Sequence, residues 1–374
     1  MKIAVNTRLL INQKMEGIQW FTFELFKRIT QAHPEHQFYF IFDRPFNKEF
    51  VFSKNVHPYV VKPQTRHPFL YLIWFHWQLP RFFKKHQIDA FISPDGFLPL
   101  KTKTPSLTVI HDINFEHFPQ GMPFLYAWYY QKFFPKYAII ASRIVTVSHF
   151  SKADIIQKYA IENSKIDVVY NGINTSFGPI SKEEQLKTQK KFSNGKPYFL
   201  FVGSLHPRKN LPNLLKAFEK YKQITQNETQ LLVVGSKLFK TKAIFKAYNQ
   251  MIYHENVHFC GHLFEYDLHK VTASAKALAF VSYFEGFGIP IVEAFACQTP
   301  VITSNTSSMP EIAGDAAILI NPHSTDEIAQ ALQKMDNEDL RLELIEKGKI
   351  RSKDFDWNIS AQKLWENIEE ILPK

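Results

Sequence analysis

Cysteine is scarce in this sequence, since only Cys260 and Cys297 occur among its 374 residues. The two thiols are far apart along the chain and fall in different predicted elements, so they form neither a disulfide framework nor a zinc quartet. A chain with so few thiols fits a reducing compartment, and we therefore expect a cytoplasmic protein.

Long hydrophobic runs are also absent. No stretch of 18 uncharged apolar residues occurs, so the sequence predicts no membrane-spanning helix. The first residues, MKIAVNTRLL, begin directly with the alternating pattern of a strand, and no long apolar core with a cleavage site follows. We therefore expect no signal peptide.

Acidic residues are in deficit, because 35 Asp and Glu stand against 45 Lys and Arg, for a net charge of +10. This charge favours anionic partners such as nucleotides, phosphates, nucleic acids or anionic membrane surfaces. No recognisable nucleic-acid-binding module accompanies the charge, so we expect no nucleic acid partner. The aromatic and basic stretch 66–86 is interpreted mainly as a buried helix, with contact to an anionic membrane as the alternative.

Short apolar runs alternate with amphipathic segments along the whole chain, which is typical of a parallel sheet covered by helices. Helices are predicted at 17–31, 69–86, 124–141 and 151–160, and others alternate with the later strands. Strands are predicted at 2–7, 37–43, 89–93, 107–110, 144–148, 166–170, 197–204, 230–236, 256–260, 277–282, 300–304 and 316–320.

This periodicity fades between residues 171 and 196 and then restarts with PYFLFVGS. We interpret the break as an interdomain connection and predict an α/β protein of two doubly wound, Rossmann-like domains, 1–178 and 179–356, that face each other. In such sheets ligands bind outside the carboxyl ends of the strands. Residues that directly follow strands are therefore the first candidates for chemistry.

Two adjacent cations, Arg208 and Lys209, follow the strand PYFLFVGS in the segment LHPRKN. A strand exit that leads into a helix offers free backbone N–H groups, and with two cations it makes a suitable phosphate cradle. A solvated basic turn is the alternative interpretation.

The segment EGFGIPIVEA occupies the equivalent position after the strand ALAFVS. Gly286 and Gly288 allow the backbone to approach a ligand closely, and Pro290 suits the first turn of a helix whose N–H groups can face an anion. Glu285 can accept hydrogen bonds from sugar hydroxyls, or it is a solvated loop residue. Glu293 can bind a ligand, or it is an acid that only stabilises the helix start.

Taken together, these segments resemble the large retaining glycosyltransferase family 4, which has the GT-B fold, over nearly the whole chain. The E-x7-E spacing of EGFGIPIVEA, joined to RKN about eighty residues upstream, carries most of the resemblance. It is strengthened by VIHD, TVSHFSKADI, VVYNGIN and SNTSSMPEIAGDAAILINP. The GT-B fold implies a central cleft between the domains and a last helix, 357–374, that packs back on the first domain.

The resemblance also implies roles for the second domain. Arg208 and Lys209 would bind the donor diphosphate, Glu285 the hydroxyls of the transferred sugar, and Glu293 the ribose. The backbone around the glycine turn would contact the donor as well. This group of donor-binding residues comprises Gly203, Phe287, Gly288 and Ile289.

Two residues of the first domain complete the implied site. His111, in VIHD, would reach the donor sugar across the cleft, although a lone His after a strand is more often structural. Gly17 would approach the phosphates or the acceptor. Many relatives carry a double glycine at this loop, whereas here Glu16 precedes Gly17.

Three other patterns are given structural interpretations. Asp354-Phe355-Asp356 matches a DxD triplet that holds a metal in some sugar transferases, but Asp356 is better placed to cap a helix. Ser148 is interpreted as a helix-start residue, because no nucleophile elbow surrounds it. A histidine and cysteine group matches no zinc spacing, and it consists of His254, His258, Cys260 and His262.

The resemblance implies a retaining glycosyltransferase that needs neither metal nor cofactor. It would move a hexose from a nucleotide-diphospho-sugar, and GDP-mannose is the first choice of donor. The acceptor is expected to be a glycan or lipid-linked glycan of surface polysaccharide biosynthesis. The protein is expected in the cytoplasm, in peripheral contact with the inner face of the membrane. Two alternatives stay open, a GT-B nucleotide-sugar 2-epimerase and a catalytically silent sugar-nucleotide-binding subunit.

Overall fold

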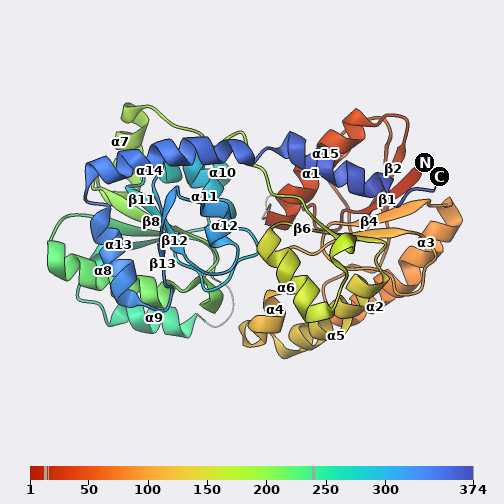
Figure 1. Ribbon diagram of the computed structural model, residues 1–374, viewed down its shortest axis with the longest axis horizontal. Coiled ribbons are helices and arrows are strands. Elements are labelled where there is room, and N and C mark those ends of the chain that lie inside the picture. Colours follow the sequence, from red (N-terminus) through yellow and green to blue (C-terminus); the bar gives the residue numbers. More distant parts are fainter. Residues whose placement is uncertain (12–14, 16, 238–240, 374) are drawn as a thin grey trace. The chain divides into compact units, whose positions relative to one another are not determined.

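The computed structural model describes residues 1–11, 15, 17–237 and 241–373. They fold into two compact units, each with a parallel sheet covered by helices on both faces (Figure 1). The first unit combines Met1–Gly172 with Asp356–Lys374, and the second is Ile173–Phe355. The prediction of two doubly wound α/β domains is therefore confirmed.

The first unit ends at Gly172, earlier than the boundary expected at 178. The apolar side chains of Ile173 and Phe177 explain the difference, because they pack with Ala273 and Cys297 of the second unit. The segment that looked like a polar connection thus contributes to the core of the second unit.

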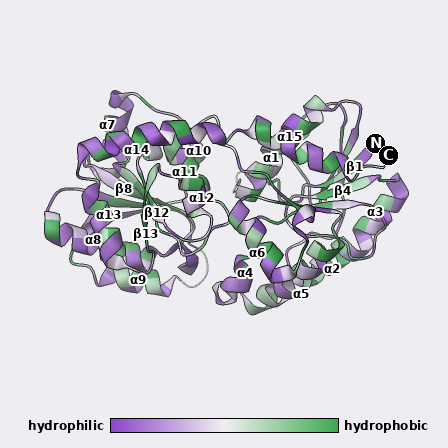
Figure 2. Ribbon diagram, viewed as in Figure 1, coloured by the Kyte–Doolittle hydropathy of each residue, from purple (hydrophilic) through white to green (hydrophobic). Residues whose placement is uncertain are grey.

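Seven parallel strands make the sheet of the first unit, in the order β3-β2-β1-β4-β5-β6-β7. Most of their residues are buried apolar ones, as expected for a sheet covered on both faces (Figure 2). The strands are β1 (Lys2–Asn6), β2 (Gln37–Phe42), β3 (Val56–Val60), β4 (Ala90–Ser93), β5 (Ser106–Val109), β6 (Arg143–Thr146) and β7 (Ile166–Val168). The main helices are α1 (Gly17–Ala32), α2 (Pro68–Ile73), α3 (Leu79–His86), α4 (Asn114–His117), α5 (Phe124–Ile140), α6 (His149–Tyr159) and α15 (Trp357–Glu369).

Two local features of this unit differ from the prediction. Strand β3 was not predicted, because Pro58 interrupts its pattern; proline is tolerated there since β3 lies at the edge of the sheet. The single helix predicted at 69–86 is divided into α2, a π-helix at Trp74–Gln78, and α3. Pro80 lacks the N–H that would bond to the carbonyl of His76, so a regular helix is interrupted at this point.

The C-terminal helix α15 packs on α1 within the first unit. Arg28 Nε donates to Asn358 Oδ1 at 3.0 Å, and the Trp365 ring stacks on His33 with centroids 3.7 Å apart. A side chain at Gly172 would collide with Trp357, which explains glycine at the point where the chain leaves the unit.

The sheet of the second unit has six parallel strands in the order β10-β9-β8-β11-β12-β13. The chain runs outward from β8 and then returns to β11, so the gap between their carboxyl ends is the switch point at which such sheets bind ligands. The strands are β8 (Tyr198–Val202), β9 (Gln230–Val234), β10 (Val257–Gly261), β11 (Ala277–Phe280), β12 (Val301–Ser304) and β13 (Ala317–Ile320). The helices are α7 (Lys182–Ser193), α8 (Leu211–Thr225), α9 (Lys242–Asn249), α10 (Glu265–Ala273), α11 (Ile289–Ala296), α12 (Met309–Ala313), α13 (Thr325–Lys334) and α14 (Glu338–Arg351).

Across the residues that the structure describes, no helix combines the length and the apolar character needed to span a bilayer.

Gly235, directly after β9, determines how closely two loops approach at the ligand-binding edge. Its φ is +150°, and a Cβ there would lie 1.9 Å from the carbonyl oxygen of Gly203, which follows β8. The close approach requires glycine at 235, and Gly203 itself has φ +152°, which residues other than glycine rarely adopt.

We predict that Gly235→Ala lowers the stability of the second unit by roughly 2–4 kcal/mol, because a methyl group must displace backbone. Thermal unfolding followed by circular dichroism measures this. Gly178→Ala is the control, since a Cβ at Gly178 meets nothing within 4 Å. Equal melting temperatures for the two variants would contradict the prediction.

Candidate functional site

Two cations and one carboxylate meet at the carboxyl ends of β8 and β11. Arg208 Nη1 donates to Glu285 Oε2 at 2.8 Å, and Lys209 Nζ donates to Glu285 Oε1 at 2.6 Å. Each carboxylate oxygen thus has its own cation. The residues predicted from two separate segments are brought together in one cluster at the switch point of the sheet.

The cation-bearing turn is fixed by its own backbone and by a buried asparagine. Pro207–Lys209 form one turn of 3-10 helix, whose first free N–H, that of Arg208, donates to His206 Nδ1 at 3.1 Å. Asn210 is fully buried and donates to the carbonyls of Val281 and Pro322 at 2.9 and 2.7 Å. Because Asn210 ties the turn to the residues after β11, it positions both cations.

The loop that carries Glu285 is held by two serines that the sequence analysis did not single out. Ser307 Oγ accepts from the N–H of Glu285 at 3.0 Å. Ser308 is fully buried, and its Oγ lies 2.9 Å from the Glu285 carbonyl and 3.0 Å from that of Phe287. Both serines belong to SSMPEIAGDAA. The sequence identified this motif as part of the family resemblance but did not predict that it holds the loop of Glu285.

Glu285 is ionised despite its burial. Burial acts to raise its pKa, but the charges of Arg208 and Lys209 and a hydrogen bond from Lys209 lower the pKa to about 2. The ammonium of Lys209 also lies 5.0 Å from the centre of the Phe280 ring. The three side chains thus bring two positive charges and one negative charge together.

The glycine turn leads directly into α11. Gly288 precedes the helix with φ +107°, and its missing side chain leaves room for Ile291, whose Cδ1 would lie 3.0 Å from a Cβ. Ile289 is the first helical residue, and Pro290 follows it in the first turn. Pro290 has no N–H and the N–H of Ile291 donates to the Gly288 carbonyl at 2.9 Å, so the N–H of Ile289 and the helix dipole are what favour an anion at this end. Phe287 is buried and contacts Phe355 edge to face.

Glu293 lies farther along α11 and is half-buried. Among the residues that the structure describes, nothing donates a hydrogen bond to its carboxylate or forms an ion pair with it. Burial, and next the charge of Glu265, raise the pKa of Glu293 to about 8. A carboxyl group without a protein partner is available for the hydroxyl groups of a ligand.

His111 follows β5 in the first unit and is held by a backbone carbonyl. Its Nε2 lies 2.9 Å from the Pro94 oxygen, which can only accept, so Nε2 carries the proton and Nδ1 is left as an acceptor. Burial lowers the pKa of His111, which favours the neutral ring. Gly17 is the first residue of α1. Glu16, which stands where many relatives carry a second glycine, lies outside the described residues.

A buried ion pair supports the loop that receives His111. Arg8 Nε donates to Asp95 Oδ2 at 2.7 Å, and Asn6 Nδ2 donates to Asp95 Oδ1 at 2.8 Å. The Arg8 guanidinium also lies 4.7 Å from the centre of the Phe97 ring. This network was not predicted from the sequence, although Arg8 and Asp95 both follow predicted strands, which was the signal available.

The structural interpretations of two other patterns are confirmed. Asp356 caps α15 by accepting from the N–H of Asn358 at 2.6 Å, and Asp354 pairs with Arg351 at 2.8 Å. Ser148 caps α6. Over the described ranges, no group of three or more His, Cys, Asp or Glu side chains is arranged to hold a metal ion.

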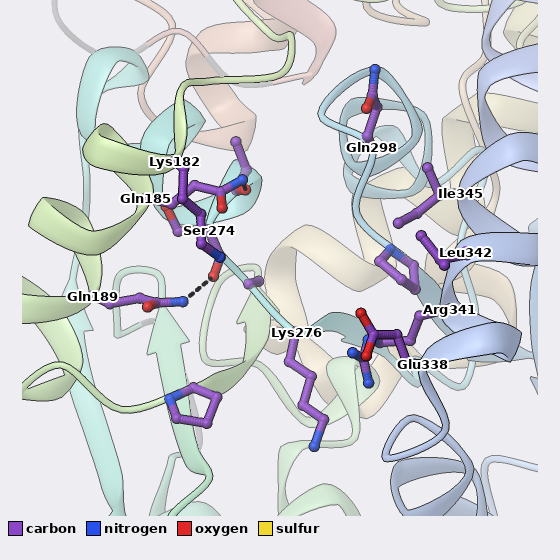
Figure 3. Close-up of a pocket in the computed structure, with 14 residues that line it drawn as sticks. Lys182, Gln185, Gln189, Ser274, Lys276, Gln298, Glu338, Arg341, Leu342 and Ile345 are labelled. Carbon is purple, nitrogen blue, oxygen red and sulfur yellow. Dashed lines mark hydrogen bonds between the residues drawn. The ribbon is translucent and has the colours of Figure 1, made fainter.

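A cavity of about 590 Å³ in the second unit lies away from the cation cluster (Figure 3). Pro197, Lys276 and Pro300 line it, and these residues directly precede β8, β11 and β12. The cavity is therefore at the amino ends of the strands, the opposite edge from Glu285. Its size alone does not make it the site.

Comparison with protein families assigns both halves of the chain. Residues 182–351 match the family described as "Glycosyl transferases group 1", and residues 15–177 match "Glycosyltransferase Family 4". O-antigen chain mannosyltransferase B of Escherichia coli is 28% identical over 71% of this chain and 70% of that protein. O-antigen chain mannosyltransferase RfbU of Salmonella typhimurium is 28% identical over 57% of this chain and 56% of its own length.

Two solved structures share this fold, and one of them is described as a glycosyltransferase. WaaG, described as involved in lipopolysaccharide biosynthesis, superposes with a TM-score of 0.74 at 20% identity, over 97% of this chain and 98% of that one. HepE of Anabaena in complex with UDP-glucose gives a TM-score of 0.77 at 18% identity, over 99% and 100% of the two chains. At these identities the likeness concerns the fold.

The raised pKa of Glu293 predicts a pH-dependent stability. The folded state holds the Glu293 proton more tightly than the unfolded state, whose carboxyl has a pKa near 4.5, so stability falls as the pH rises from about 4.5 to about 8. Glu293→Gln should therefore raise the melting temperature at pH 8.5 and change it little at pH 4.5. The control is Glu338→Gln, at an exposed position on α14. If Glu293→Gln stabilises equally at both pH values, Glu293 is not protonated in the fold.

Proposed function

The chain belongs to the group 1 and family 4 glycosyltransferases with the GT-B fold, and on this basis we propose the reaction that it carries out. It transfers a hexose, with mannose from GDP-mannose as the first choice, to a glycan or lipid-linked glycan acceptor with retention of configuration. The observation that carries this proposal is the pairing of Arg208 and Lys209 with Glu285 beside the start of α11.

Departure of the nucleoside diphosphate is the step for which this cluster is suited. The bond from the sugar to the diphosphate breaks, and negative charge develops on the leaving phosphate oxygen. Once the donor is bound, Arg208, Lys209 and the positive end of the α11 dipole stabilise that charge without further reorganisation. The chain itself thus supplies the positive charge, and we propose that no metal ion is required.

Glu285 changes its partners in this proposal. In the ligand-free protein its two oxygens are bound by Arg208 and Lys209. When the donor binds, the diphosphate takes over the cations, and Glu285 turns to the hydroxyls of the transferred sugar. As the diphosphate leaves the sugar, it accepts the proton of the acceptor hydroxyl on the same face, so no nucleophile from the protein is needed.

The remaining site residues bind the other parts of the donor. Glu293 binds the ribose hydroxyls, for which its carboxyl group is suited, since no described residue donates a hydrogen bond to it. Gly203, Phe287 and Gly288 offer backbone contacts beside the sugar and phosphates. For His111 and Gly17 of the first unit, a role in binding the donor or the acceptor is proposed on the family resemblance alone.

Mannose and a surface glycan are supported by the relatives. Two O-antigen chain mannosyltransferases match more than half of this chain. A Campylobacter jejuni relative, 28% identical over 58% of this chain, is named for transfer to a diphospho-undecaprenol-linked saccharide. A lipid-linked acceptor lies at a membrane surface, and we propose that the enzyme works at the inner face of the cell membrane.

We predict that Lys209→Ala lowers kcat by roughly 10²–10³-fold, the loss typical of removing one group that stabilises transition-state charge. Glu293→Ala should nearly abolish transfer by weakening donor binding.

Transfer is measured with GDP-mannose, UDP-glucose and ADP-glucose on a mannosyl acceptor, with and without EDTA. Lys216→Ala, at an exposed position of α8, is the matched control. Near wild-type transfer by Lys209→Ala would overturn the assignment, and loss of activity in EDTA would overturn metal independence.

A further inference from the structure

The outer face of α5 carries only apolar and basic side chains. The helix contains no Asp or Glu, and Phe124 is 84% exposed, Trp128 42% and Ile139 61%. A helix facing water normally has polar residues on its outer side. The exposed residues of α5 are Phe124, Leu125, Trp128, Lys132, Lys136, Ile139 and Ile140.

These residues form one continuous face and are not scattered. Phe124, Trp128, Lys132 and Lys136 follow one another at intervals of four, so they lie in one row along the helix. The opposite side of α5 is occupied by rings that belong to the core of the first unit, including Tyr137. Lys132 Nζ lies 4.6 Å from the centre of the Trp128 ring, so the lysine stem covers an aromatic surface while its charge stays outside.

The helices before α5 extend this face. Tyr126 Oη donates to the Arg66 carbonyl at 2.9 Å, which ties α5 to the start of α2, and Figure 1 shows the two helices adjacent. Phe69 on α2 is 60% exposed, and Trp77 on the π-helix is 58% exposed. The exposed cations of α3 are Arg81, Lys84 and Lys85. We call these exposed residues of α2 to α3, together with those of α5, the α2–α5 face.

The charge of this region has one sign. Residues 50–88 contain six Lys and Arg and residues 117–153 contain four, and neither stretch contains an Asp or Glu. Two copies that met through this face would bring like charges together, which disfavours a symmetric dimer. Exposed Trp and Phe beside Lys and Arg instead match the interface of an anionic bilayer, where rings lie at headgroup level and cations meet lipid phosphates.

We propose that the α2–α5 face binds the surface of an anionic membrane. The apolar side chains of α5 enter the headgroup region, and the lysines contact lipid phosphates. The role of this binding rests on the proposed function: it would hold the first unit at the membrane, where a lipid-linked acceptor is found. The binding itself follows from exposure and charge.

Sedimentation of the full chain with phosphatidylglycerol-containing vesicles tests the proposal. The wild type should bind at low salt and be released at high salt, because screening weakens the contact. Lys132→Glu with Lys136→Glu should lower the partition coefficient by at least roughly 30-fold, at about fivefold per lysine. Phe124→Ser with Trp128→Ser should lower it as well, by removing apolar area from the contact.

Matched controls lie in the second unit. Lys190→Glu with Lys334→Glu changes the net charge equally, and Ile252→Ser with Phe264→Ser removes exposed apolar side chains. Both should bind vesicles as the wild type does. The proposal is wrong if the wild type does not bind, or if the face variants bind no more weakly than the controls. It is also wrong if the face variants only convert a dimer to a monomer in analytical ultracentrifugation.

Transfer to a water-soluble acceptor separates this proposal from the proposed function. The face variants should transfer to such an acceptor at the wild-type rate, because their substitutions are outside the proposed donor site. Failure of the wild type to transfer would contradict the proposed function and leave the vesicle result standing. Normal transfer without vesicle binding would contradict only the membrane surface.

Discussion

The charge arrangement at the candidate site of the second unit depends on one buried carboxylate shared by two cations. Glu285 would be unstable as an isolated buried charge, and Arg208 and Lys209 would repel each other without it. Asn210 and Ser308 fix the two turns that carry them, so the three charges are arranged before any ligand arrives. This arrangement is suited to an anionic ligand, because such a ligand can replace the Glu285 carboxylate on two cations that already lie side by side.

The parallel sheet explains why the cluster forms where it does. Residues that follow β8 and β11 meet because these strands are neighbours whose chain connections run in opposite directions. Gly203 and Gly235 let the loops cross closely at this edge, and Gly288 starts α11 beside Glu285. In the first unit the same rule places Arg8 and Asp95 after β1 and β4, where they support the loop that binds His111.

Much of the fold and of the second unit's candidate site was predictable from the sequence. Apolar periodicity marks each strand and helix locally, and residues that directly follow strands lie where such sheets bind ligands. The doubly wound fold was predicted and is confirmed, and the motif resemblance identified the glycosyltransferase family. Strand β3 was missed because Pro58 conceals it, and the ion pair of Arg8 with Asp95 was missed because it joins residues far apart in the chain. The roles of Ser307 and Ser308 depend on loop geometry that residue spacing does not contain.

The central claim is that the donor diphosphate replaces Glu285 on Arg208 and Lys209. Calorimetric titration of GDP into the wild type, Lys209→Ala and Glu285→Gln tests it directly. Because Glu285 competes with the diphosphate for the same cations, Glu285→Gln should bind GDP at least as tightly as the wild type, whereas Lys209→Ala should bind about tenfold or more weakly. Equal losses of affinity in the two variants would contradict the account.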